Sequence, residues 1–133
     1  MSLIVALALS VVDDPGCQVS ASAERACVAY EELDKRRAEL KRVFDGTIEA
    51  FRREDSRFRQ DTFNRSDDRS YQRDLVAAQA AWETLVENEC ELAALATRPG
   101  TDEELNHIQC EIERVEQRTA YLAELPGRLS LPR

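Results

Sequence analysis

Hydrophobic residues recur every three or four positions along three long stretches of this chain. In the first stretch, seven of nine positions on one helical face are apolar: Tyr30, Leu33, Leu40, Phe44, Ile48, Phe51 and Phe58. Arg37 and Asp55 interrupt this stripe, and Gly46 lies within it. The spacing predicts one long amphipathic helix, or two helices if the chain breaks near Gly46, where glycine weakens helical structure.

Two further helices are predicted downstream. The second runs from about Ser70 to Thr97, where Arg98-Pro99-Gly100 stops it, and the third begins at a Thr101-x-x-Glu104 capping box and ends at Pro126-Gly127. Their expected inward faces are Leu75, Ala78, Gln79, Trp82, Leu85, Val86, Ala93 and Ala96 in the second helix, and Leu105, Ile108, Ile112, Val115, Thr119 and Leu122 in the third. Short turns between long helices predict an all-α, antiparallel bundle of three helices, or four if the first breaks.

The chain has 133 residues, which fits one domain. We expect a single helical domain over residues 17–125, a lead-in over 1–16 and a tail over 126–133. An apolar run from Leu3 to Leu9 precedes the small residue Ser10 and resembles the end of a secretory signal. This run is too short to cross a membrane, which needs roughly 20 apolar residues, so no integral span is expected.

Charge is concentrated in the second half of the chain. The formal net charge is −8, and residues 67–133 carry 14 acids against 7 bases. Such a field argues against nucleic-acid binding, which needs a basic surface, and favours a basic protein partner. The candidate partner-binding acidic face is made of Glu83, Glu87, Asp102, Glu103 and Glu104. A solvated helix surface is the simpler explanation of these acids.

Four cysteines in a small chain predict two disulfides in an oxidising compartment. Of the three possible connectivities, we favour Cys17–Cys27 and Cys90–Cys110. An antiparallel hairpin of the second and third helices would bring Cys90 and Cys110 level. Cys110, however, points away from the apolar stripe of its helix, which requires that this helix be covered on two sides or begin irregularly.

Catalytic and metal sites are not indicated. His107-x-x-Cys110 places an imidazole and a thiol on one helical face, but the cysteine spacings provide no close ligand pair for structural zinc. The sequence contains neither a Gly-rich phosphate loop nor a G-x-S-x-G or H-E-x-x-H motif. We therefore expect no enzyme activity, no metal and no cofactor.

The order Cys17, Cys27, Leu33-Asp34, Ala78-Gln79-Ala80-Ala81-Trp82, Cys90, Cys110 and Arg118-Thr119-Ala120-Tyr121-Leu122 resembles the lysozyme-inhibitor LprI-like N-terminal domain family of exported bacterial proteins. Its core signature corresponds here to Gln79, Trp82 and Arg118. The chain departs from the family pattern at Asp34, Arg37 and Val86-Glu87, which replace Asn, Tyr and Arg-Asp. The resemblance implies a disulfide-bonded helical domain outside the cytoplasm, periplasmic or secreted, and in one branch inhibition of lysozyme.

The leading hypothesis is therefore an extracytoplasmic binding protein that inhibits lysozyme through its acidic surface. A turn at 64–69 or 98–103 would obstruct the enzyme's cleft. The alternative from another class is a structural module of the cell envelope that associates through Phe58 and Phe63. A third hypothesis gives Cys90, His107 and Cys110 a redox or metal role.

Overall fold

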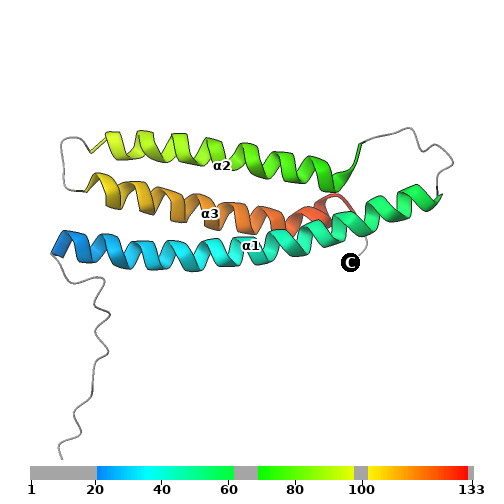
Figure 1. The fold of residues 1–133 in the computed structure, drawn as a ribbon, viewed down its shortest axis with the longest axis horizontal. Helices are drawn as coiled ribbons and strands as arrows, with labels where there is room; N and C mark the ends of the chain where they lie inside the picture. Colours follow the sequence, from blue (N-terminus) through cyan, green and yellow to red (C-terminus); the bar gives the residue numbers. More distant parts are fainter. Residues whose placement is uncertain (1–20, 62–68, 98–101, 132–133) are drawn as a thin grey trace, which may run out of the picture.

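Three helices form the part of the chain that the computed structural model describes, residues 21–61, 69–97 and 102–131. They are α1 (Ala21–Asp61), α2 (Tyr71–Leu95) and α3 (Glu103–Arg128), and these residues contain no strand. Consecutive helices run antiparallel, so that α1 and α3 point the same way, and α1 extends beyond its partners at its C-terminal end (Figure 1). None of the described helices is both long and apolar enough to cross a membrane. The predicted signal remnant lies outside the described residues.

The first helix is continuous through Gly46, so the four-helix alternative is wrong. Gly46 has no atom of another residue near the position of a Cβ, apart from its own helix and chain neighbours. No close packing therefore demands glycine here. The buried residues on both sides of Gly46, Leu40 and Phe51, stabilise a continuous helix against the intrinsic weakness of glycine.

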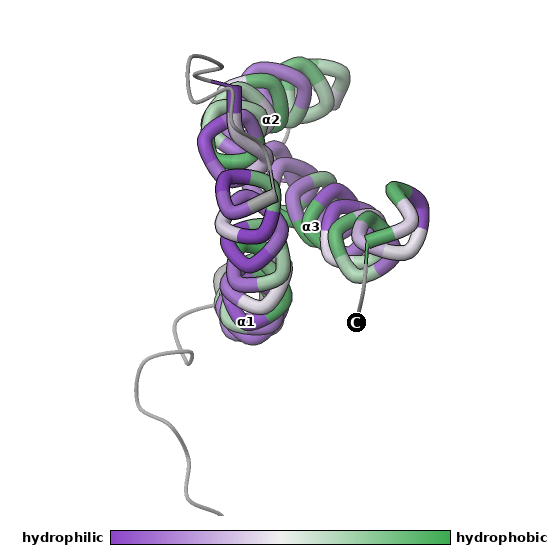
Figure 2. The backbone as a smooth tube through the Cα atoms, turned by 90° about the vertical axis from the view of Figure 1, so that its right-hand side faces the viewer, coloured by the Kyte–Doolittle hydropathy of each residue, from purple (hydrophilic) through white to green (hydrophobic). Residues whose placement is uncertain are grey.

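The core lies chiefly between α1 and α3. The buried residues that form it are Ala26, Leu33, Leu40, Phe51, Leu75, Ile108, Val115 and Leu122. Seen along the bundle, α3 lies to one side of the pair α1 and α2 (Figure 2). The third helix packs against both others, while α1 and α2 touch each other less. The predicted stripe of α3 is therefore confirmed at Ile108, Val115 and Leu122.

The second face of α3 explains the orientation of Cys110. Cys90 and Cys110 form a disulfide between α2 and α3 with a Cα–Cα distance of 5.4 Å. Cys110 lies opposite the α1-facing stripe because α3 is covered on two sides. The described residues contain this one disulfide rather than two. Cys27 is itself disulfide-bonded, but its predicted partner Cys17 lies outside the described residues, so that pairing stays a prediction.

Several expected core positions are on the surface instead. Tyr30 and Phe58 of α1 are 45% and 50% exposed, and Leu85 of α2 is 53% exposed. Ala78 and Ala96 are also exposed. The buried residues of α2 are Leu75, Val86, Cys90 and Ala94. A helical wheel drawn for one helix cannot identify so narrow a buried face. Which residues of α2 are buried depends mainly on how α2 packs against α3.

The third helix differs from the prediction at both ends. Its N-cap is Asp102, whose side chain makes no capping hydrogen bond, and Thr101 lies outside the described residues. At the other end the helix continues through Pro126 to Arg128, so the predicted stop at Pro126-Gly127 is wrong. A proline at this position leaves the carbonyl of Leu122, four residues earlier, without its helical N–H donor.

Thr47 of α1 replaces that missing donor. The single proton of its hydroxyl is shared between the Leu122 carbonyl oxygen across the interface and the Val43 carbonyl oxygen of its own helix, each 3.0 Å away, and the Thr47 residue is only 4% exposed. After Arg128 the helix is terminated by two backbone hydrogen bonds, from Ser130 N to Gly127 O and from Leu131 N to Pro126 O. These two bonds are those of a Schellman motif, which satisfies the last carbonyls of a helix.

Candidate functional site

Arg37, one of the two interruptions in the α1 stripe, joins all three helices. Its Nη1 donates to Glu83 of α2 at 3.3 Å, and its Nη2 donates to Glu111 of α3 at 2.8 Å. Burial by itself lowers the pKa of the Arg37 guanidinium. The hydrogen bonds and charges of Glu111 and Glu83 outweigh this effect, and the pKa is raised. The guanidinium therefore remains charged at every physiological pH.

Asp55, the second interruption, also makes a contact between helices. Its two carboxylate oxygens accept hydrogen bonds from the backbone N–H groups of Tyr71 and Gln72, at 2.9 and 3.0 Å. Ser70 caps the same helix by accepting from Arg73 N at 3.0 Å. Free N–H groups at a helix start attract a carboxylate, so Asp55 fixes the start of α2 against α1. Both polar interruptions thus position α2.

An acidic cleft opens beside the Arg37–Glu83 pair. It has a volume of about 300 Å³ and is lined by Arg37, Glu83, Thr84, Glu87, Glu91, His107 and Glu111. His107 lies between two of these carboxylates, with its Nε2 2.9 Å from Glu111 and its Nδ1 3.5 Å from Glu91. Glu87 is exposed and makes no ion pair or hydrogen bond with any other described residue. Four carboxylates therefore face one guanidinium and one imidazole.

Three of these carboxylates form a row along α2, which we call the acidic row: Glu83, Glu87 and Glu91. Residues four apart lie one above another on a helix, so the row follows one side of α2. Arg37 neutralises its first member, whereas Glu87 and Glu91 project toward solvent. The helix that carries the row is anchored to α3 by Cys90, which fixes the backbone position of the three carboxylates.

The predicted acidic face is divided into two parts. Glu83 and Glu87 line the acidic cleft, but the N-cap Asp102 and the first-turn residues Glu103 and Glu104 lie at the start of α3, about 15 Å further along the bundle by helix geometry. Asp102 lies 3.9 Å from Arg25 of α1. A hydrogen bond to Glu104 is the main cause that raises the pKa of Tyr30.

The residues of the acidic cleft that sequence reasoning did not assign to a site include Glu91, His107 and Glu111. The i, i+4 spacing from Glu83 through Glu87 to Glu91 could have indicated the first of them. His107 and Glu111 could not be assigned to the cleft, because their position depends on how α3 is rotated against α2. The sequence alone does not determine that rotation.

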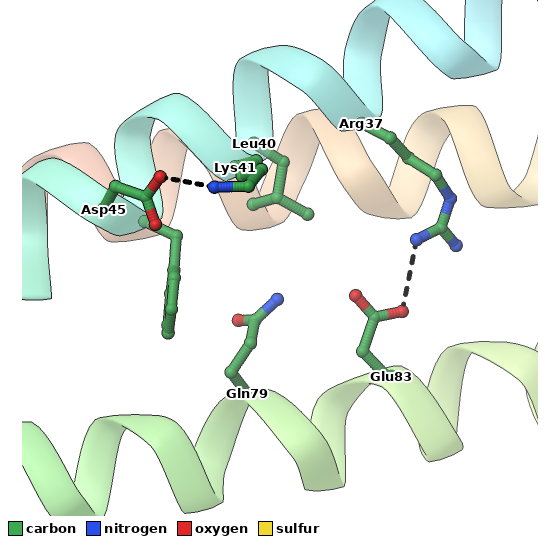
Figure 3. A pocket seen from close by; sticks show the side chains of 7 residues that line it. Arg37, Leu40, Lys41, Asp45, Gln79 and Glu83 are labelled. Carbon is green, nitrogen blue, oxygen red and sulfur yellow. Dashed lines mark hydrogen bonds and ion pairs between the residues drawn. The ribbon is translucent and has the colours of Figure 1, made fainter.

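A second cleft, with an apolar floor, lies on the other side of the Arg37–Glu83 pair. We call it the apolar cleft, a space of about 390 Å³ lined by Arg37, Leu40, Lys41, Phe44, Asp45, Gln79 and Glu83. Figure 3 shows Gln79 and Glu83 of α2 facing Leu40 and Arg37 of α1 across it. Lys41 and Asp45 pair with each other at its rim, at 2.7 Å. This cleft exists because α1 and α2 pack less closely than the other helices.

The residues of the core signature lie together between α2 and α3. Arg118 Nε donates to Gln79 Oε1 at 2.9 Å, and the guanidinium carbon lies 5.6 Å from the centre of the Trp82 ring. Tyr121 contributes a second ring at 5.2 Å. Burial lowers the pKa of Arg118. Trp82 is half-buried and packs against the core, and one face of its ring lies beside the Arg118 guanidinium in a cation–π contact.

The proposed metal role of Cys90, His107 and Cys110 is not supported, and their redox role stays a hypothesis. Both sulfurs are consumed in the disulfide, so neither is a thiolate ligand. Within the described ranges, no cluster of three His, Cys, Asp or Glu residues could hold a metal ion. Phe63 and most of the turns at 64–69 and 98–103 lie outside those ranges.

A protein-family model described as "Lysozyme inhibitor LprI" matches residues 17–122, which is most of the chain. No curated protein matches the sequence, and no solved structure does. The matched region contains the whole of both clefts and the disulfide between α2 and α3.

Proposed function

The chain belongs to the lysozyme inhibitor LprI family, and from this premise we propose that it binds lysozyme and inhibits it through the acidic row. The observation that carries the proposal is the array of carboxylates at the edge of the acidic cleft. Glu87 and Glu91 are exposed on a disulfide-anchored helix, and Glu87 has no cationic partner among the described residues.

Electrostatics supply the reason for the choice of partner. Lysozymes are commonly basic proteins, and residues 67–133 of this chain carry a net charge of −7 from 14 acids and 7 bases. Complementary fields raise association rates and orient two proteins before they touch. Lysine and arginine side chains at the rim of a lysozyme cleft would bind to Glu87 and Glu91.

Inhibition follows from rigidity and size. The bundle is held by the Cys90–Cys110 disulfide and by the Arg37 contacts to both α2 and α3. A rigid body docked against the rim of a cleft excludes a long polysaccharide without entering the catalytic site. The anchored backbone of α2 also loses little conformational entropy on binding, which favours affinity.

The proposed location is outside the cytoplasm. The Cys90–Cys110 disulfide supports this proposal, since such bonds persist in oxidising compartments and are rare in the cytosol. Lysozyme, which attacks cell walls from the outside, is encountered in the same compartment.

The test is a cell-wall lysis assay with lysozyme and the purified protein at increasing molar ratios. We expect lysis to slow at low salt and to recover as salt rises from about 10 mM toward 1 M, because the Debye length falls from roughly 30 Å to 3 Å. An acidic helical protein of equal net charge from another family serves as the control. Unchanged lysis at a large molar excess in low salt would refute the proposal.

A further inference from the structure

The outer side of α2 carries a second apolar stripe that no other described helix covers. Its three leucines, Leu85, Leu92 and Leu95, are 53%, 67% and 41% exposed. Positions on this side of the helix repeat at spacings of three and four: Ala78, Ala81, Leu85, Asn88, Leu92 and Leu95, all exposed. Single exposed leucines are ordinary on protein surfaces, but several on one side of a helix, interrupted here only by Asn88, typically mark an interaction site.

The stripe is separate from the face that packs in the bundle. At about 100° per residue, its centre lies about 130° around α2 from the side that carries Leu75, Val86 and Cys90. The acidic row lies on the opposite flank of that buried side. The stripe and the row meet at the C-terminal end of α2, because Leu95 is one turn beyond Glu91. The whole solvent side of α2 therefore presents carboxylates on one edge and leucines on the other.

Charge indicates which protein covers this stripe. A second copy of the chain carries the same formal net charge of −8, and like charges on two docking surfaces oppose association. A basic protein meets the opposite situation, because its cations approach the acidic row while its apolar residues cover the leucines. Interfaces commonly combine an apolar centre with a charged rim in this way.

We propose that the leucine stripe of α2 is the apolar half of the lysozyme-binding surface. This inference rests on the proposed function and extends it: the acidic row steers the enzyme, and the leucines hold it. The complementary surface on the enzyme is an apolar patch with lysine or arginine side chains along one edge. Electrostatic contacts then determine mainly the association rate, and leucine contacts the dissociation rate.

The experiment measures the affinity of lysozyme for the full chain by titration calorimetry at low salt. The stripe variant is Leu85→Gln with Leu92→Gln, and we expect its Kd to rise about tenfold or more through faster dissociation. The matched control is Val28→Gln with Leu129→Gln, which removes two other exposed apolar side chains, 56% and 41% exposed, from α1 and the end of α3. The control is expected to keep the wild-type Kd within about twofold.

The outcomes separate this inference from the proposed function. If the wild type binds lysozyme and the stripe variant binds equally well, the inference is wrong and the proposed function stands. If the wild type does not bind lysozyme, both are wrong. Sedimentation equilibrium provides the second measurement: a wild-type dimer that the stripe variant converts to a monomer would assign the stripe to a second copy and overturn the inference.

Discussion

At the scale of single residues, polar side chains on apolar faces complete the hydrogen bonding of neighbouring helices. Thr47 donates to the Leu122 carbonyl that Pro126 has left without a donor. Asp55 accepts from two N–H groups at the start of α2. In sequence such residues look like defects in a stripe. In the fold each one pairs a backbone group that has no partner within its own helix.

The Thr47 contact leads to a prediction about stability. Thr47→Val should lower the free energy of unfolding by about 2 kcal/mol, because it leaves a buried carbonyl unpaired while keeping the side-chain shape. Urea denaturation measures this change. Thr84→Val is the matched control, since the Thr84 hydroxyl bonds only its own helix at an exposed position, and its effect should be near zero.

A double-mutant cycle with Pro126→Ala isolates the cause. The alanine restores the N–H that helical geometry directs at the Leu122 carbonyl, so Thr47→Val should lose about 1 kcal/mol less in that background. An equal loss in both backgrounds would show that Thr47 does not compensate for the proline.

At the scale of elements, the three helices and their order could be predicted from periodicity, and their ends and rotations could not. Leu33, Leu40 and Phe51 repeat at helical spacing and are buried as expected. The end of α3 was predicted too early, at Pro126. The helix continues because Thr47, from another helix, supplies the hydrogen-bond donor that the proline lacks. Leu85 was misassigned to the core for a similar reason: its exposure depends on which neighbours α2 has.

Gly46 provides a prediction at this scale. Gly46→Ala should raise the free energy of unfolding by about 1 kcal/mol, because α1 is helical there and no other residue lies near the new methyl group. Chemical denaturation followed by circular dichroism measures the shift. Ala38→Gly, at an exposed position of the same helix, should produce a loss of similar size. A destabilised Gly46→Ala protein would mean that α1 needs its glycine.

At the scale of the whole molecule, the bundle divides its surface into areas with different tasks. The α1–α3 interface holds the core, while α2 is fixed by Arg37, Asp55 and a disulfide and presents its outer side to solvent. The acidity of this half was evident in the sequence. The separation of these acids into the acidic row and the distant carboxylates of Asp102–Glu104 was not evident in the sequence. The distance between them along the bundle depends on how α2 and α3 are aligned, which the position of the turn between them determines.

The most direct measurement of the central claim compares two charge-matched variants in the lysozyme lysis assay. Glu87→Gln with Glu91→Gln removes two exposed carboxylates from the acidic row, and Glu113→Gln with Glu124→Gln removes two exposed carboxylates from α3. Both variants have the same net charge. We predict that the first loses about tenfold in inhibition, or roughly 1.4 kcal/mol, and that the second stays close to the wild type. Equal inhibition by the two variants would contradict the assignment of lysozyme binding to the acidic row.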